Sequence, residues 1–205
     1  HPLKPITTGE GGIVTTNNHK IAKKIKSFRS HGILRKKKRH WQYDIIYHGF
    51  NYRLSDINCA LGLSQLSKIS SFLKERKKIY KKYILELKNF NSNLIIPEYS
   101  KTIKPSFHLF IINILFEKLN RNKNHFIKYL LDHKILAQQH YIPIYKFSIF
   151  EDKSYKLSAS ERYYKTSVSL PIYVGLNKKK HDKVIRTIKN YFKNNKWNIR
   201  LYKKI

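Results

Sequence analysis

The amino-terminal segment places a reactive side chain beside a tight turn. Lys4 lies five residues before the glycine-rich run Gly9-Glu10-Gly11-Gly12, which leads into the apolar pair Ile13-Val14. A neutral lysine amine can attack an aldehyde, and a lysine shielded from water loses its proton more readily. A turn that fixes the backbone beside Lys4 therefore suits Schiff-base chemistry. The alternative, that Lys4 is one of many solvated lysines, stays open on these residues alone.

Composition indicates a folded chain without a metal site. The 205 residues are 41% hydrophobic and 14% aromatic, which is typical of a globular protein. The single cysteine, Cys59, excludes an intrachain disulfide and a Cys-based metal site. The histidines lack the helical spacing of a zinc site. No apolar stretch approaches the ~20 residues that cross a bilayer, and no signal peptide is present. We therefore expect a cytoplasmic protein without a membrane partner.

The net charge of +31 raises the question of nucleic acid. Such a charge attracts polyanions nonspecifically. However, Lys, Ile, Asn and Tyr are abundant together and share A/T-rich codons, so base composition also accounts for the excess. Only Arg35-Lys36-Lys37-Lys38-Arg39 forms a dense basic run, which we interpret as a solvated insertion. No zinc-finger, helix-turn-helix or RNA-recognition signature is found. A basic nucleic-acid-binding module remains an alternative function, with nonspecific binding at most.

Hydrophobic periodicity and turn residues predict the elements of the first part of the chain. They are a strand over 13–16, a helix over 19–30 that ends at His31-Gly32, an irregular segment over 35–48, and a long helix from the cap Ser55 toward Phe90 with a break near Ser70-Ser71.

The second part of the chain alternates strands and helices. A polar segment, 91–105, contains Pro97 and Pro105 and predicts a domain boundary. Beyond it the pattern predicts strands over 108–116, 135–141 and 168–173 and helices over 124–133, 160–166 and 177–192. Such alternation indicates a small α/β domain. We therefore expect two domains, residues 1–90 and residues 91–205.

Four segments resemble one protein family. They are His1-Pro2-Leu3-Lys4-Pro5-Ile6-Thr7-Thr8-Gly9-Glu10-Gly11-Gly12, then Gly49-Phe50-Asn51-Tyr52-Arg53-Leu54-Ser55-Asp56 with its continuation to Gln65-Leu66, then His140-Tyr141-Ile142-Pro143, and finally Ser169-Leu170-Pro171. In this order they resemble the signatures of the DegT/DnrJ/EryC1/StrS sugar aminotransferases, which depend on pyridoxal phosphate. The resemblance implies an α/β fold of type I, represented here by the C-terminal portion of the large cofactor domain and a small C-terminal α/β domain.

The resemblance also implies roles for individual residues. Lys4 matches the lysine that holds pyridoxal 5′-phosphate as a Schiff base and then acts as general base. Asn51 matches an asparagine that reaches the cofactor phosphate of the neighbouring subunit. Arg53 is expected to add charge either to the same anion site or to the substrate diphosphate. His1 and His140 match positions whose side chains face the substrate.

Within the family, the amino-acid sequences of these segments most resemble those of the transaminases of pseudaminic acid synthesis. Those enzymes move an amino group from glutamate to C4 of a UDP-linked 4-keto-6-deoxy-N-acetylhexosamine, as homodimers with the active site at the subunit interface. Members also carry an N-terminal half, including an aspartate for the pyridine nitrogen, that has no counterpart here. We therefore expect a fragment that is inactive in isolation. A non-catalytic relative of the same fold is an alternative, although Lys4 argues against it.

Overall fold

The computed structural model describes residues 4–36, 39–100, 102–150 and 157–193. The chain divides into two compact units, His1–Ser70 and Ser71–Ile205.

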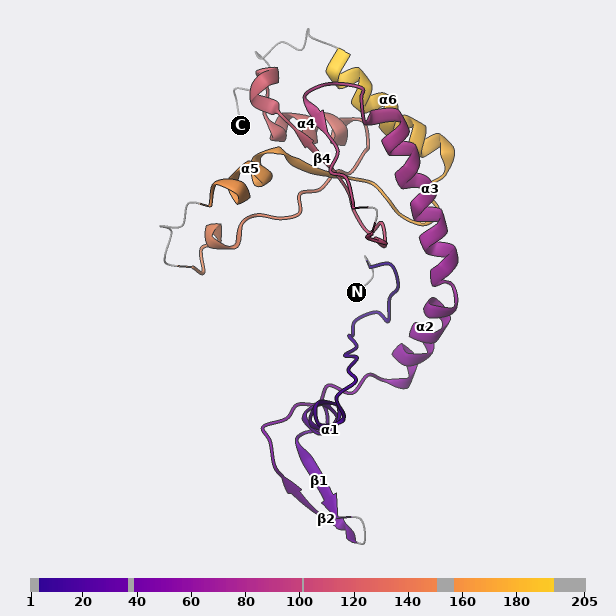
Figure 1. Ribbon diagram of the computed structural model, residues 1–205, viewed down its shortest axis with the longest axis vertical. Helices are drawn as coiled ribbons and strands as arrows, with labels where there is room; N and C mark the ends of the chain where they lie inside the picture. Colours follow the sequence, from indigo (N-terminus) through magenta and orange to yellow (C-terminus); the bar gives the residue numbers. More distant parts are fainter. Residues whose placement is uncertain (1–3, 37–38, 101, 151–156, 194–205) are drawn as a thin grey trace. The chain divides into compact units, whose positions relative to one another are not determined.

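The N-terminal unit contains two helices and a β-hairpin (Figure 1). Helix α1, His19–Phe28, begins where the Asn18 side chain accepts hydrogen bonds from the amides of Lys20 and Ile21, at 2.9 and 3.2 Å. Such a cap satisfies amides that have no partner within the helix. The helix is followed by the antiparallel strands β1, Ile33–Lys36, and β2, Arg39–Ile45. Helix α2 spans Asp56–Ser67 and is capped by Ser55. The predicted helix over 19–30 and the Ser55 cap are confirmed.

Two predictions for this unit are wrong. Residues 13–16 form no strand, because no neighbouring strand of the described chain supplies hydrogen bonds to them. The segment 35–48, predicted to be irregular, instead holds most of the hairpin, in which Ile33 pairs with Ile45 and Arg35 with Tyr43. The alternation of Trp41, Tyr43 and Ile45 with polar residues was its signal. The basic run spans the hairpin turn, and its Lys37 and Lys38 lie outside the described residues.

The long predicted helix is present and broken as expected. Helix α3, Ile69–Leu87, follows α2 after Lys68. The second half of α3 buries Ile79, Tyr83 and Leu87 in the C-terminal core. The two units therefore divide between Ser70 and Ser71, so that α3 packs with the C-terminal unit. The domain ranges 1–90 and 91–205 stay a prediction for the whole protein.

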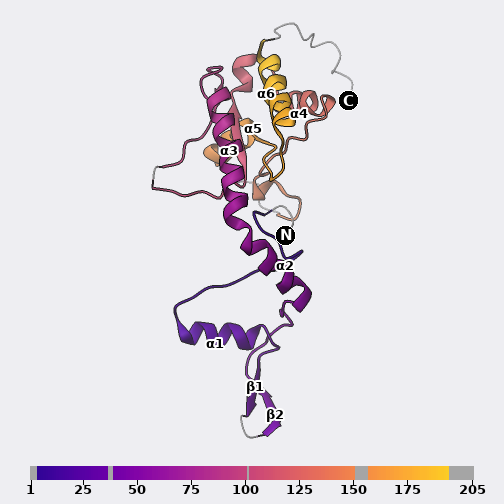
Figure 2. The ribbon, with the colours of Figure 1, turned by 90° about the vertical axis from the view of Figure 1, so that its right-hand side faces the viewer.

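The C-terminal unit is built on a three-stranded antiparallel sheet of order β3-β4-β5. Its elements, besides α3, are β3 Leu94–Ile95, β4 Phe110–Ile114, the 3₁₀ helix Phe116–Leu119, α4 Lys123–Asp132, the 3₁₀ helix Ile144–Lys146, α5 Ser158–Thr166, β5 Ser167–Leu170 and α6 Lys178–Lys193. Helices α4 and α6 lie side by side (Figures 1 and 2). The small α/β domain expected from the sequence is thus present.

The strand predicted over 135–141 is wrong. Ile135 and Ala137 are buried and Leu136 is exposed, so the alternation expected of a strand exists. However, β5 is only four residues long and pairs along its length with β4. Its other side meets a single residue, Gln138, which exchanges two backbone hydrogen bonds with Ser169 at 2.7 and 3.0 Å.

The core of this unit lies between the sheet and helices α3, α4 and α6. Phe110, the first residue of β4, is fully buried and stacks on Tyr83 of α3 at 4.3 Å between ring centroids. Elsewhere in the core, the ring of Phe126 of α4 meets the ring of Tyr191 of α6 edge to face, with 4.8 Å between the ring centroids. Such pairs add about 0.5–1.5 kcal/mol to the burial of the rings. An ion pair between Lys189 and Glu86, 2.7 Å apart, further joins α6 to α3.

His181 of α6 is a buried titratable group in this core. Its side chain is 3% exposed and meets the Tyr83 ring edge to face at 4.2 Å. Burial lowers the pKa of His181, and the nearby Lys82 ammonium lowers it further, whereas Asp182 and Glu86 act in the opposite direction. The folded unit therefore keeps this imidazole neutral at a pH where the unfolded chain protonates it.

We predict that His181 makes this unit sensitive to mild acid. As pH falls below the unfolded value of about 6.5, the unfolded state gains a proton that the folded state resists, so stability is lost down to the lowered folded pKa. The substitution His181→Gln should reduce the loss of denaturation midpoint between pH 7 and pH 5. Equal slopes in the parent protein and His181→Gln would contradict the prediction.

Candidate active site

Lys4 lies three residues before a turn, residues 7–10, that is held by its own side chains. The Thr7 hydroxyl accepts a hydrogen bond from the amide of Gly9 at 3.0 Å, and the Thr8 hydroxyl donates to the carbonyl of Glu10 at 2.9 Å. Gly9 has a φ of +84°, a conformation that favours glycine. The Lys4 side chain is exposed. The turn thus fixes the chain that follows Lys4 and leaves its amine accessible.

The start of α2 anchors this turn. The side-chain amide of Asn58 donates to the carbonyl of Thr8, and the Asn58 side-chain oxygen accepts from the hydroxyl of Ser55. Gly62, one turn further along α2, also faces the turn, because a Cβ added there would lie 2.9 Å from Cγ2 of Thr8. A larger residue at position 62 would push the two segments apart. The Lys4 turn is therefore fastened to the first turns of α2.

Asn51 and Arg53 lie on the loop that leads into α2, and backbone hydrogen bonds fix that loop to the end of α1. The amide of Phe50 donates to the carbonyl of Phe28 at 2.8 Å, and the amide of Tyr52 donates to the carbonyl of Arg29 at 2.9 Å. Close approach is possible because of Gly49, whose added Cβ would lie 2.2 Å from the amide nitrogen of Gly32. The side chains of Asn51 and Arg53 are both exposed. Their backbone is thus anchored while their polar ends can reach a ligand.

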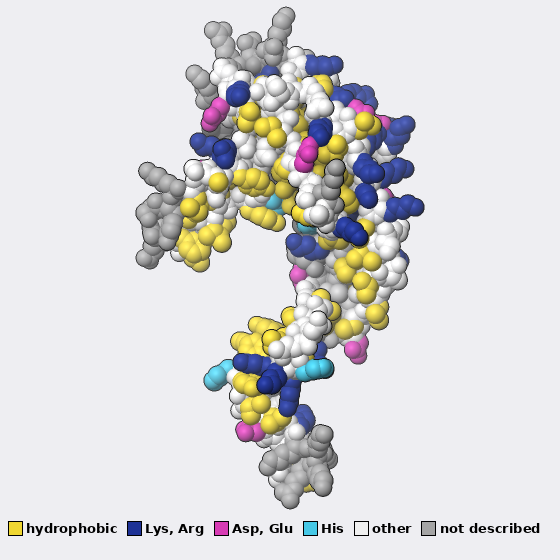
Figure 3. All heavy atoms as spheres, viewed as in Figure 1, with side chains coloured by type: hydrophobic (Ala, Val, Ile, Leu, Met, Phe, Trp, Pro, Cys, Tyr) yellow, Lys and Arg dark blue, Asp and Glu magenta, His cyan; other side chains and the backbone are white. Residues whose placement is uncertain are grey.

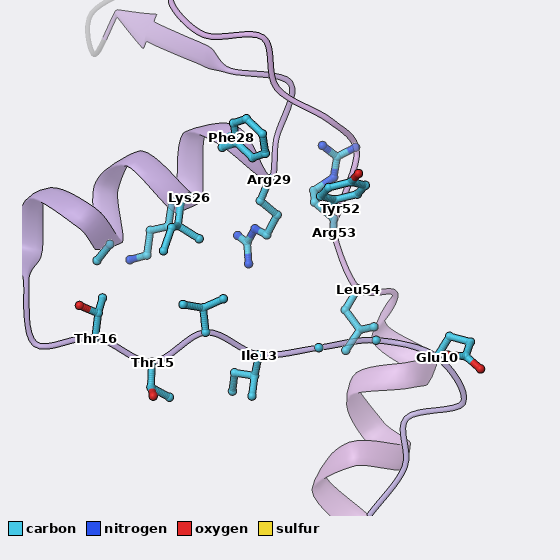
Figure 4. A pocket seen from close by; sticks show the side chains of 15 residues that line it. Glu10, Ile13, Thr15, Thr16, Lys26, Phe28, Arg29, Tyr52, Arg53 and Leu54 are labelled. Carbon is cyan, nitrogen blue, oxygen red and sulfur yellow. The ribbon is translucent and has the colours of Figure 1, made fainter. Parts of the chain in front are cut away.

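A groove of about 1050 Å³ lies beside this loop (Figure 4). Its walls are the extended segment 10–16, the last turns of α1 and the segment 52–54. Arg53 lines it together with Lys26 and Arg29. Lys4 and Asn51 do not line it. Leu54, at the end of the loop that carries Asn51 and Arg53, packs closely against Gly11, which follows the Lys4 turn. A Cβ added at Gly11 would lie only 2.9 Å from Cδ1 of Leu54.

His140 belongs to the C-terminal unit. Its Nδ1 lies 2.7 Å from the hydroxyl of Ser169, which is a buried residue of β5. The His140 ring also meets the Tyr141 ring edge to face at 4.8 Å. The hydroxyl thus limits the rotation of a half-buried imidazole. The fifth predicted site residue, His1, lies outside the described residues.

Asn58, Thr8 and Ser169 are residues of this arrangement that sequence reasoning missed. Asn58 had a weak signal, because it lies three residues after the Ser55 cap, where a side chain can reach the cap. Thr8 and Ser169 lie within the motifs quoted above, but their contacts join segments far apart in the chain. No periodicity predicts such contacts.

Basic side chains gather over α3 and α6 of the C-terminal unit (Figure 3). They include the exposed Lys77, Lys78 and Lys81 of α3 and Lys179 and Lys183 of α6. Within the described part of the chain, no three His, Cys, Asp or Glu side chains are arranged to hold a metal ion. Among the described helices, none combines the length and apolar character that a membrane crossing requires.

Comparison with known proteins identifies the family. The model of the DegT/DnrJ/EryC1/StrS aminotransferase family matches residues 1–189. The chain belongs to this family. The resemblance recognised from the four segments is therefore confirmed.

Similar proteins fall within the expected subgroup. The UDP-4-amino-4,6-dideoxy-N-acetyl-beta-L-altrosamine transaminase of Campylobacter jejuni (strain 81-176) is 40% identical over 183 residues, which are 87% of this chain and 47% of that protein. The Helicobacter pylori (strain 26695) transaminase of the same name is 35% identical over 181 residues, 86% of this chain and 47% of that protein. This chain thus spans about half the length of the curated relatives it matches.

Solved structures agree with the family. The chain matches Helicobacter pylori PseC, an aminotransferase involved in the biosynthesis of pseudoaminic acid, with a TM-score of 0.84 and 32% identity over 92% of this chain and 50% of that one. The sugar aminotransferase CalS13 of Micromonospora echinospora, at 24% identity and a TM-score of 0.81, has the same fold. The α/β fold of type I expected for the DegT-family chain is confirmed.

We predict that Asn58→Ala loosens the Lys4 turn. One internal hydrogen bond contributes about 0.5–1.5 kcal/mol, so amide exchange at Gly9, whose amide is bound by the Thr7 hydroxyl, should accelerate roughly two- to tenfold. Hydrogen–deuterium exchange measured by NMR checks this. The matched control is Leu63→Ala, which removes a 70% exposed side chain of the same helix and should not change this rate. Unchanged exchange in Asn58→Ala would show that the turn does not depend on this contact.

Proposed function

We propose that the whole protein of which this chain forms part is a pyridoxal-phosphate-dependent sugar aminotransferase. It would move an amino group from glutamate to C4 of a UDP-linked 4-keto-6-deoxy-N-acetylhexosamine. The observation that carries the proposal is Lys4, exposed at an anchored turn, within a chain 40% identical to a transaminase of that sugar class. The homodimer and the cytoplasmic location expected from the sequence are part of the proposal.

The residues present fit the cofactor. Lys4 offers a primary amine on a fixed turn, and Asn51 and Arg53 offer amide and guanidinium donors on a fixed loop. These are the groups that an aldehyde and a phosphate require. When bound, pyridoxal phosphate supplies an aldehyde that captures amines and a ring that takes up electron density. Lys4 would hold the aldehyde end, and Asn51 and Arg53 would hold the phosphate bound to the neighbouring subunit.

Lys4 has a second role in this mechanism. Its neutral amine would take the proton from the α-carbon of glutamate, and as an ammonium it would return a proton later. This transfer requires that the amine stay close to one carbon atom. The turn secured by Thr7, Thr8 and Asn58 limits the movement of the chain that follows Lys4. The anchored turn therefore reduces the entropy that such positioning costs.

His140 would contribute to the sugar site. An imidazole can donate to or accept from sugar hydroxyls and phosphate oxygens. The contact of Nδ1 with the Ser169 hydroxyl holds the ring in one orientation, which would favour a defined contact with the substrate. His1 is proposed for the same substrate on the family resemblance alone.

The proposal is tested in a fused protein, in which this chain replaces the matching 183 residues of the Campylobacter jejuni transaminase. With pyridoxal phosphate, the fused protein should gain the visible absorbance of bound cofactor and form glutamate-dependent 4-amino sugar. Lys4→Ala and the charge-preserving Lys4→Arg should lose the band and lower turnover by at least about 10³-fold, because neither forms a Schiff base at neutral pH. Activity is measured by mass spectrometry of the sugar product.

Lys20→Ala is the matched control, because Lys20 is an exposed lysine of α1 in the same unit. It should keep both the band and the turnover. A band that survives Lys4→Ala would remove Lys4 from its proposed role. A fused protein that binds cofactor but transfers no amino group would instead support the non-catalytic alternative.

A further inference from the structure

Helices α3 and α6 of the C-terminal unit lie side by side (Figures 1 and 2). Two ion pairs join them, one between Lys82 and Asp182 and one between Glu86 and Lys189 at 2.7 Å. The pair that comes later in α3 also comes later in α6, so the two helices run in the same direction. Packed helices have axes about 8–10 Å apart. The outer faces of α3 and α6 therefore form one continuous surface.

The acidic side chains of these two helices are all used within the unit. Helix α3 contains two, Glu75 and Glu86, and α6 contains one, Asp182. The carboxylate of Glu75 accepts a hydrogen bond from the amide of Gly175 at 2.5 Å. The other two form the ion pairs that join the helices. No carboxylate of α3 or α6 is therefore left to neutralise their outer faces.

Basic residues follow the outer face of each helix. On α3 they recur at a spacing of three and four residues, which places them on one side of a helix. The buried Ile79, Tyr83 and Leu87 occupy the opposite side. The two rows, which we call the basic stripes, are Lys74, Lys77, Lys78 and Lys81 on α3, and Lys179, Lys183 and Arg186 on α6. All seven residues are exposed, and within the described part of the chain none has a hydrogen bond or an ion pair.

The shape and chemistry of the basic stripes suit the backbone of a nucleic acid. Neighbouring side chains of a stripe are about 5–6 Å apart at Cβ, so each stripe is a regular row of cations. A phosphodiester backbone is a regular row of anions, and an ammonium contacts a phosphate as a point charge. A membrane surface is a poorer match, because amphipathic helices bind it with an exposed apolar face. Among the exposed large apolar side chains of the described residues, α3 contributes only Leu85 and α6 contributes none.

We propose that the basic stripes bind the phosphate backbone of a nucleic-acid duplex without reading its sequence. Each cation that neutralises a phosphate releases a condensed counterion, and this release is the driving force for binding. Contacts to phosphates position a protein on a duplex but carry no sequence information. This binding goes beyond the proposed amino transfer and does not depend on it.

The experiment uses the full chain and two fluorescent DNA duplexes of about 20 base pairs with different base compositions. Fluorescence anisotropy measures the association constant from about 50 to 200 mM salt, without cofactor or substrate. The two duplexes should bind with similar affinity. The logarithm of the association constant should fall linearly with the logarithm of the salt concentration. Its slope should be about −4 to −6, because four to seven phosphate contacts contribute about −0.9 each.

Reversal of charge within the basic stripes should weaken this binding. The triple variant Lys77→Glu, Lys81→Glu and Lys183→Glu should bind at least about tenfold more weakly and reduce the magnitude of the salt slope by about three. Replacement of the same three lysines by Gln, which adds no carboxylate, should act in the same direction with a smaller effect. All three residues are exposed, so both variants should fold as the parent chain does, which circular dichroism checks.

The matched control has the same net charge but leaves the basic stripes intact. It carries Lys20→Glu, Lys23→Glu and Lys118→Glu, at exposed positions outside α3 and α6. Its affinity should fall by less than about threefold, because only the long-range attraction is reduced. In the parent chain, bound duplex should also protect Lys77 and Lys183 from acetylation, as measured by mass spectrometry, and should leave Lys20 reactive.

Several results would overturn the inference. One is the absence of duplex binding at about 150 mM salt. Equal weakening by the stripe variant and the control would show that total charge, and not this surface, drives the binding. A preference of more than about tenfold for one duplex would contradict binding that is independent of sequence. Vesicles of phosphatidylglycerol provide the last comparison: if the stripe variant loses vesicle binding but keeps duplex binding, the basic stripes belong to a membrane surface instead.

Discussion

The contact between Asn58 and the Thr8 carbonyl is the constraint on which the candidate site depends. It joins residues fifty positions apart and fastens the Lys4 turn to the start of α2. A lysine at the end of a long side chain loses much conformational entropy when it is positioned, and a fixed backbone lowers that cost. The Ser55 cap serves the same contact, because its hydroxyl donates to the side-chain oxygen of Asn58. One helix start thereby stabilises α2 and positions the Lys4 turn.

The two units differ in how much of their apolar side-chain surface they bury. The C-terminal unit encloses a core in which Phe110, Phe126 and Leu130 are fully buried. In the N-terminal unit, neither α1 nor α2 has a buried residue, and its described apolar side chains are mostly exposed. The extended segment 11–16 and the apolar face of α1 therefore remain uncovered by the described residues of this unit.

Local signals in the sequence were sufficient to predict the helices and to recognise the motifs. Asn18 and Ser55 each supply the capping oxygen that their position predicted, and the break between α2 and α3 falls at Lys68, two residues before the expected Ser70-Ser71. Strands were less predictable, because a strand requires a partner that local sequence does not specify. Residues 13–16 lack that partner, residues 135–141 reach β5 at one residue only, and the hairpin over 33–45 was concealed by its basic run. The site residues came from motif resemblance, whereas the contacts that hold them, such as Asn58 with Thr8, required the fold.

The most direct test of the account is the chemical identity of the residue that carries the cofactor. The fused protein is loaded with pyridoxal phosphate, reduced with borohydride, digested and analysed by mass spectrometry. The account predicts the mass of the reduced cofactor on the peptide that contains Lys4 and on no other lysine. Attachment to a different lysine, or no attachment in a protein that is folded and complete, would contradict it.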